Sequence, residues 1–206
     1  MNKRESFLTT YPKSYFLDPD DLNTIESYLK NVGWIDATDK VTKVEKPGDG
    51  NMNLVLRVTT TSGSMIVKQS RPWVERFPEI NAPVNRIEAE QTFYKKIASF
   101  DQLGSYCPQL IGFDKDSYVM AIEDLGKSSD CTFIYQKSSI LENKQLMDLV
   151  YFISRLHYQE WCNSDETFPP NSELKKLNHE HIFIFPGLCK RQGCYRHAIL
   201  RGFNSI

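Results

Sequence analysis

Three features of this 206-residue chain predict a chemistry by their residue types and their order. They are a short loop with two glycines, a lysine, and a pair of glutamates. The loop runs from Gly48 to Asn53, and Lys68, Glu88 and Glu90 follow it. Glycines let a loop backbone approach a ligand closely, and a lysine supplies a cation beside phosphate oxygens. The order therefore predicts a site for the phosphates of a nucleotide. The candidate loop contacts are Gly48, Asp49, Gly50, Asn51, Met52 and Asn53.

A β-hairpin is predicted to hold the lysine beside this loop. Two apolar, β-prone runs, Asn53–Val58 and Met65–Gln69, flank a turn at residues 60–64. Lys68 lies inside the second run, directly after two apolar residues. Because burying an unpaired ammonium group is costly, Lys68 requires an acidic partner.

The next predicted helix, from Val84 to Phe100, offers that partner because it carries both glutamates. Glu90 is favoured, since apolar residues behind it match a buried helix face, and Glu88 remains the alternative. A lysine paired to a helix glutamate and to phosphates is the arrangement that kinases use. The apolar residues in question are Phe93, Tyr94 and Ile97.

An apolar strand that ends in an acidic turn supplies a third piece. Residues 118–122 form the second strand of a predicted hairpin with Pro108–Phe113, and Glu123, Asp124 and Leu125 follow it. In a two-lobed kinase this position is the hinge, where backbone groups pair with adenine. The three residues after the strand are therefore candidates for contacts with a purine base.

Other elements are predicted on either side of these motifs. A helix begins after Asp18, the expected N-cap, and ends at Gly33. Val41–Val44 is a short strand that leads to the glycine loop. A helix with an apolar stripe is predicted over Asn143–Trp161, and the periodic signals weaken beyond it.

These elements predict an α+β fold in two parts. Residues 1–124 are expected to form a complete small lobe, an antiparallel sheet plus a helix. Residues 125–206 are expected to form a hinge and an incomplete helical lobe. The tail at residues 187–206 has clustered arginines and no clear apolar period.

The motifs resemble the 5-methylthioribose kinase family, which belongs with the aminoglycoside and choline kinases of protein-kinase-like fold. The resemblance covers about Tyr15 to Pro186 and is carried by Gly48–Val55, Ile66–Gln69, Arg86–Glu90 and Glu123–Gly126. It implies an ATP- and Mg²⁺-dependent kinase that phosphorylates a sugar hydroxyl in methionine salvage. The resemblance also suggests that the protein forms a homodimer. By this resemblance, Lys68 would hold the α- and β-phosphates of ATP, the glycine loop would cover them, and Glu123 to Leu125 would meet adenine.

The chain departs from the family where the catalytic loop is expected. Such kinases carry a His-x-Asp sequence, an Asn five residues after that Asp, and a magnesium-binding Asp further on. None of the four histidines here has Asp two positions later, and the last aspartate is Asp165. No catalytic or metal-binding residue is therefore assigned, and the chain is expected to stop before the catalytic machinery and to be inactive alone. The alternatives are a nucleotide-binding or interaction remnant without catalysis, or a fragment of another aminoglycoside-phosphotransferase-like kinase.

The composition argues against several other classes. A net charge of −1 does not favour nucleic acid or a membrane surface, and no apolar run approaches the roughly 20 residues of a membrane span. The five cysteines lack zinc-knuckle spacing and are expected to be reduced. His179 and His181 lie two residues apart rather than four, which favours a structural role over a helical zinc pair. The expected location is the cytoplasm.

Overall fold

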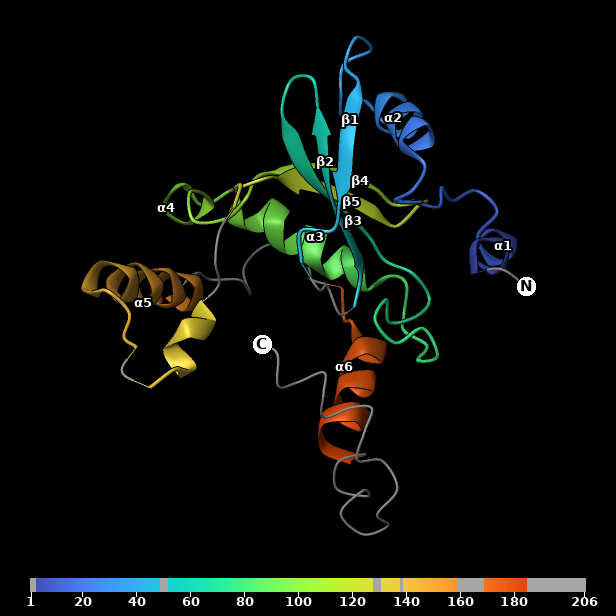
Figure 1. Ribbon diagram of the computed structural model, residues 1–206. Helices are drawn as coiled ribbons and strands as arrows, with labels where there is room; N and C mark the ends of the chain where they lie inside the picture. Colours follow the sequence, from blue (N-terminus) through green and yellow to red (C-terminus); the bar gives the residue numbers. More distant parts are fainter. Residues whose placement is uncertain (1–2, 49–51, 128–130, 138, 159–168, 185–206) are drawn as a thin grey trace. The chain divides into compact units, whose positions relative to one another are not determined.

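The structure, a computed structural model, has two compact units (Figure 1). The first comprises the described residues up to Gly126 together with 169–171, and the second comprises 127–158 and 172–184. The first unit is α+β, as predicted, and the second is helical within its described part. The residues that the structure describes are 3–48, 52–127, 131–137, 139–158 and 169–184.

Five strands of the first unit form one antiparallel sheet (Figure 1). Their order is β1-β2-β3-β5-β4, so each of the two predicted hairpins supplies a pair of neighbouring strands. Both hairpins are confirmed, because apolar runs bounded by turn residues are strong strand signals. The strands are β1 (Val41–Glu45), β2 (Leu54–Thr60), β3 (Ser64–Gln69), β4 (Leu110–Asp114) and β5 (Val119–Glu123).

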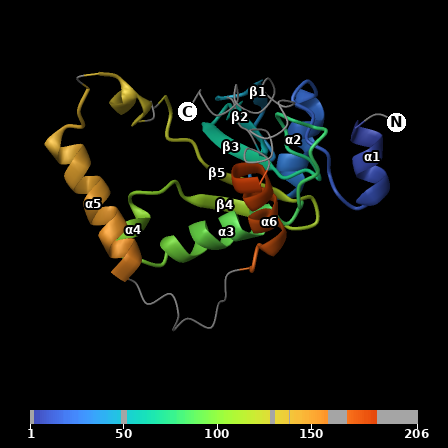
Figure 2. The ribbon, with the colours of Figure 1, turned by 90° about the horizontal axis from the view of Figure 1, so that it is seen from below.

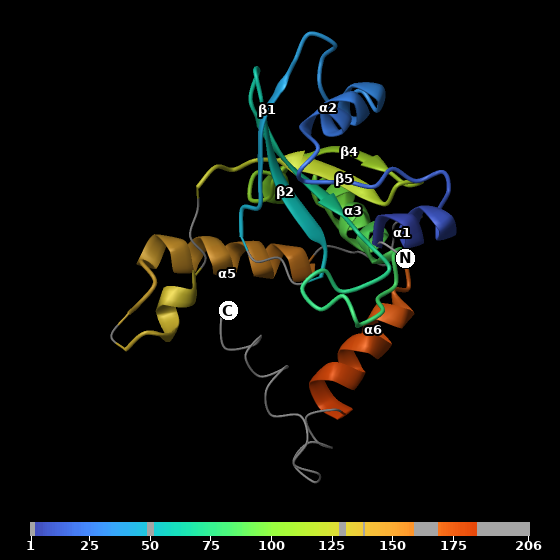
Figure 3. The same ribbon diagram turned by 45° about the vertical axis from the view of Figure 1, so that its right-hand side comes forward.

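The larger core lies on one face of the sheet, under helix α2 (Leu22–Asn31). Burial alternates along β2, as expected for a strand with one face turned inward. Its Leu54, Leu56 and Val58 pack in one cluster with α2 residues such as Ile25 and Leu29. In the view of Figure 3, α2 lies beside β1.

Helix α3 (Arg86–Ile97) packs on the opposite face, along β4 and β5 (Figure 2). A smaller cluster forms there around Ile87, Met120 and Ile122. The helix is shorter at both ends than the predicted range, and the short helix α4 (Asp101–Gly104) follows its C-terminal end. This second face is the one that carries the lysine.

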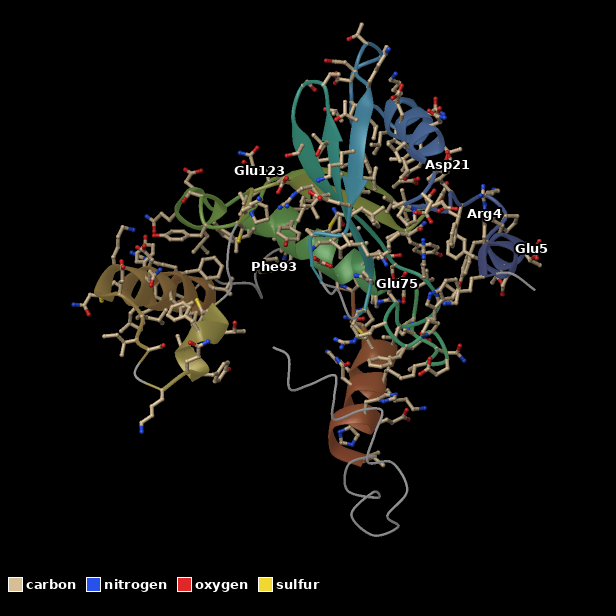
Figure 4. All side chains as sticks on the ribbon, viewed as in Figure 1. Arg4, Glu5, Asp21, Glu75, Phe93 and Glu123 are labelled. Carbon is tan, nitrogen blue, oxygen red and sulfur yellow. The ribbon has the colours of Figure 1, made fainter. Side chains whose placement is uncertain are left out.

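The start of α2 corrects one prediction. Asp18 is not the N-cap: it begins a turn, in which Asp21 N–H donates to the Asp18 carbonyl at 3.1 Å. Asp21 is the cap, and its carboxylate accepts from Thr24 N–H at 3.1 Å (Figure 4). Pro19 favours the second position of a turn as strongly as the first turn of a helix, so the sequence fitted both registers. The predicted stop at Gly33 is confirmed, with a φ of +73° that favours glycine.

The N-terminal segment is attached to the sheet by buried polar bonds. Helix α1 (Lys3–Thr10), which was not predicted, buries Phe7. Gln69 at the end of β3 accepts from Leu17 N–H at 3.0 Å and donates to the Tyr15 carbonyl at 2.7 Å. These bonds fix the end of β3, the strand that presents the lysine.

The second unit contains the predicted long helix. α5 (Asn143–Tyr158) confirms it over the described residues, and the last three residues of the predicted range lie outside them. No helix within residues 3–184 that the structure describes has both the length and the apolar character needed to cross a membrane. The tail at 187–206 also lies outside the described residues. The unit's other elements are a 3₁₀ turn (η1, Cys131–Tyr135), α6 (Ser172–His179) and a π-helical turn (η3, Glu180–Ile184).

Candidate nucleotide-binding site

Lys68 and Glu90 form an ion pair on the α3 face of the sheet. Lys68 Nζ lies 2.6 Å from Glu90 Oε1, and the two side chains are 18% and 31% exposed. The Lys68 ammonium also lies 5.9 Å from the centroid of the Tyr94 ring. The predicted partner is therefore confirmed as Glu90 rather than Glu88, while its role toward a nucleotide stays a prediction. An ammonium group has three N–H donors, and among the described residues Lys68 gives only one of them to a carboxylate.

The strand register places an apolar surface beside this lysine. Val55 of β2 lies directly opposite Lys68, and Met120 of β5 lies opposite it on the other side. Paired residues on neighbouring antiparallel strands share a face of the sheet, as do residues two apart on one strand. Val55 and Ile66 therefore lie on the lysine face, and both are partly buried. Counting back across the predicted hairpin from Lys68 would have found Val55, which was missed.

The exit of the glycine loop is held by Arg86, the first residue of α3. Arg86 Nε donates to Asn53 Oδ1 at 2.8 Å, and Nη2 donates to the Met52 carbonyl at 2.7 Å. Gly48, at the loop's entrance, is exposed. The predicted site residues Asp49, Gly50 and Asn51 lie outside the described residues. The structure thus brings the loop exit to the same helix that carries Glu90.

Arg86 is buried and charged. Only 5% of the residue is exposed. Burial lowers the pKa of its guanidinium to about 10, although the negative charge of Glu75 (Figure 4) works in the opposite direction. At neutral pH the side chain therefore stays protonated. No local signal in the sequence distinguishes this arginine from an exposed residue at a helix start.

Asp124, a predicted adenine contact, uses its carboxylate for internal bonds. Its oxygens accept from Arg57 Nε at 2.8 Å, Arg57 Nη2 at 2.9 Å, Ser64 Oγ at 2.7 Å and Gly126 N–H at 3.0 Å. Burial by itself raises the pKa of Asp124, but the bonds from Arg57, Ser64 and Gly126 outweigh it and hold the pKa below the ordinary value. With its side chain 4% exposed, this carboxylate is occupied. Any contact of Asp124 with a base would run through its backbone.

Glu123 and Leu125, on either side of Asp124, are less fully engaged by hydrogen bonds than Asp124. Glu123, at the end of β5 (Figure 4), accepts from Gln109 N–H through its Oε2 at 3.1 Å. Leu125 is 62% exposed. Within the part of the chain that the structure describes, no hydrogen bond engages the Leu125 N–H or carbonyl. Of the three predicted hinge residues, Leu125 thus presents an open backbone donor and acceptor beside an apolar side chain.

A hollow of about 290 Å³ lies on the first unit but not at these residues. It is lined by Gly33, Trp34, Asp39 and the tip of the β2–β3 hairpin. Asp39 is engaged there, since hydrogen bonds from Ser62 and Thr61 lower its pKa and use both its oxygens. Met65 also lines the hollow, and its position three residues before Lys68 places it on the other face of the sheet. The hollow therefore takes no part in the candidate site.

The geometry of the Lys68–Glu90 pair and the names of similar proteins both indicate a kinase. A strand lysine held by a glutamate of the following helix is a feature of kinases. The chain is similar to methylthioribose kinase of Erwinia tasmaniensis, with 32% identity over 108 residues, 48% of this chain and 25% of that protein. It is 29% identical over 100 residues to methylthioribose kinase of Citrobacter koseri, and 26% identical over 169 residues, 81% of this chain, to that of Bacillus cereus (strain G9842). The chain spans 25% to 40% of the length of these curated relatives. No family model matches the chain.

Proposed function

We propose that this chain is the nucleotide-binding part of a small-molecule kinase of the methylthioribose kinase kind, with a protein-kinase-like small lobe formed by the first unit. The observation that carries the proposal is the Lys68–Glu90 pair. It lies on a sheet face with apolar neighbours and next to an anchored glycine-loop exit. The similarity to proteins named methylthioribose kinase supports the same class independently. The cytoplasmic location and the homodimer remain predictions.

Each part of ATP has a proposed contact in the chain. Lys68, which bonds only Glu90 among the described residues, would meet the α- and β-phosphates, while Glu90 holds its ammonium in place. Val55 and Ile66 offer an apolar surface of the kind on which a base packs. The Leu125 N–H and carbonyl, which no hydrogen bond engages among the described residues, would suit the edge of adenine. The glycine loop, Gly48 to Asn53, would cover the phosphates.

Magnesium does not receive a site from the same residues. Among the described residues, no group of three or more His, Cys, Asp or Glu side chains is placed to hold a metal ion. Magnesium is usually bound by one or two carboxylates together with phosphate oxygens. The carboxylates of Glu90 and Asp124 are both bound to cations of the chain. We therefore derive no transfer step through this ion.

The acceptor of the phosphoryl group is proposed by similarity alone, as a sugar hydroxyl in methionine salvage. A second candidate function is nucleotide binding without catalysis by this polypeptide. The observation that favours it is that no histidine in the chain is followed by Asp two residues later. The two functions share the same nucleotide site and differ only in turnover.

Calorimetric titration of the purified chain with ATP, with and without Mg²⁺, tests the proposal. We expect saturable binding of one ATP per chain, with ADP binding next best and adenosine weakest. The order follows from the charge of Lys68, because each added phosphate adds negative charge beside the ammonium. Absence of saturation with millimolar ATP, in a sample shown to be folded by circular dichroism, would reject the proposed function.

A further inference from the structure

Arg86 satisfies all the donors of its guanidinium with oxygens of the chain. Nη1 donates to the carbonyls of Arg71 and Pro83, both at 2.8 Å. Nη2 donates to the carbonyl of Trp73 at 3.3 Å, in addition to that of Met52, and Nε donates to the Asn53 amide. A guanidinium has five N–H donors, and these bonds use each of them. One side chain thus joins the loop exit, the segment after β3 and the start of α3.

Among the described residues, no carboxylate accepts a hydrogen bond from this side chain. Its five acceptors are four backbone carbonyls and one side-chain amide. The nearby carboxylate of Glu75 is bound elsewhere: Arg71 Nη1 lies 3.3 Å from both its oxygens, and Trp73 Nε1 lies 3.3 Å from one. A buried charge that carbonyl dipoles solvate, and that Glu75 offsets only from a distance, keeps part of its field in a low-dielectric region. A polyanion bound at the loop would experience that field.

Arg86 and Glu90 lie four residues apart on α3. This spacing places them on the same face of the helix, one turn apart. Arg86 links that turn to the loop exit, and Glu90 links it to Lys68. The first turn of α3 therefore connects the two groups that would grip phosphates from different sides.

We propose that Arg86 is a positioning residue that sets the glycine-loop exit at a fixed place relative to Lys68, and so determines the affinity for the polyphosphate of the nucleotide but not for its base. This inference rests on the proposed function for its ligand. Its structural part, the anchoring of Met52 and Asn53, can be tested without any ligand.

The test compares Arg86→Met with Lys95→Met. Lys95 is exposed on the same helix, so the control removes an equal charge without touching the loop. We expect Arg86→Met to weaken ATP by about tenfold or more, the scale of a lost charge-assisted contact, and adenosine by less than about twofold. Lys95→Met should leave both affinities nearly unchanged. Equal weakening of ATP and adenosine by Arg86→Met would overturn the proposal, because a merely structural residue would produce that result.

Hydrogen exchange of the ligand-free proteins supplies the second readout. The Glu75 N–H donates to the Met52 carbonyl at 3.3 Å, the same oxygen that Arg86 holds. Faster exchange of the Glu75 and Leu54 amides in Arg86→Met, with unchanged exchange in α2, is the expected result. Unchanged exchange at Glu75 and Leu54 would overturn the anchoring. If wild-type chain binds neither ATP nor adenosine, the proposed function fails, and exchange alone decides whether Arg86 anchors the loop.

Arg86→Met could fail to fold because it leaves several buried carbonyls without donors. Asn53→Ala then replaces it, because this change removes one acceptor and leaves the four backbone bonds of Arg86 in place. We expect the same pattern of faster exchange at Glu75, smaller in size. Exchange equal to wild type in this variant would count against the anchoring in the same way.

Discussion

Two ion pairs begin on neighbouring strands of the sheet, with Arg57 on β2 and Lys68 on β3, and they differ in how fully their carboxylates are hydrogen-bonded. Arg57–Asp124 is closed: the carboxylate receives four hydrogen bonds, and the guanidinium also donates to the Gly126 carbonyl at 2.8 Å. Lys68–Glu90 is open: one bond of 2.6 Å joins two partly exposed side chains. The closed pair joins β2 to the segment after β5, and its Asp124 carboxylate is occupied by four bonds. An open pair keeps a charge in place with donors still available, which is what a phosphate site requires.

The largest expected effect concerns catalysis, which neither pair supports. Turnover of ATP and 5-methylthioribose by the purified 206-residue chain should be at least about 10⁴-fold below that of a full-length methylthioribose kinase, since an aligned base and charge stabilisation are each worth roughly 10²–10⁴-fold. A radiolabelled phosphate-transfer assay with both proteins side by side measures it. Turnover within about tenfold of the relative would overturn the expectation that the chain is inactive alone.

The open pair should govern nucleotide affinity. Lys68→Ala is expected to weaken ATP by about 1.5–3 kcal/mol, the scale of a charge-assisted hydrogen bond. Glu90→Ala should weaken it less, because the lysine remains but loses its support, and Glu88→Ala should do least. Calorimetric titration of the three variants, with Lys95→Ala as the matched control, gives the order. If Glu88→Ala weakens ATP binding more than Glu90→Ala, then Glu88 supports the site and the assignment of Glu90 is wrong.

The closed pair should govern stability instead. Asp124→Ala removes a nearly buried carboxylate from four donors and is expected to lower the free energy of unfolding by about 1.5–3 kcal/mol. Glu90→Ala should lower it by less than about 1 kcal/mol, because its pair is more exposed. Urea denaturation followed by circular dichroism compares the two. Equal losses of stability would remove the distinction between the pairs.

The closed pair should also respond to acid. The pKa of Asp124 is lower in the folded protein than its ordinary value of about 3.9, so its stabilisation is fully present above that value. It is lost as the pH falls through the lower, folded pKa. The stability difference between wild type and Asp124→Asn should therefore shrink below about pH 4. Asp39, whose pKa is also lowered, is unchanged in both proteins and cancels in this difference. A difference that stays constant down to pH 2 would contradict the assignment.

Local signals made one pair predictable and hid the other. Lys68 lies in an apolar strand, so the sequence indicated that it needs an acidic partner. The helix that follows offers few acids, so the partner could be inferred as well. Asp124 looked like the acidic turn of a hinge, because its partner Arg57 lies 67 residues earlier and nothing local marks the two as neighbours. Ion pairs between distant strands depend on register, which is fixed by tertiary packing.

The same contrast holds for the backbone elements. Both hairpins could be predicted because alternating apolar residues and turn residues agree. The cap of α2 could not, since Asp18 and Asp21 are equally good caps and only the turn at Pro19 separates them. Helix α6 was missed because its eight residues contain only two leucines and no full apolar stripe. The role of Arg86 could not be predicted for the same reason as that of Asp124. Its hydrogen-bond acceptors come from segments that are distant from it in the sequence.

The central claim is that the open ammonium of Lys68 receives the phosphates of ATP. The most direct test is lysine labelling with an amine-reactive reagent, read by mass spectrometry, in the presence of ATP, adenosine or neither. Lys68 should be protected by ATP and not by adenosine, while labelling of Lys95 stays the same in all three samples. ATP that binds by calorimetry yet leaves the labelling of Lys68 unchanged would contradict the account.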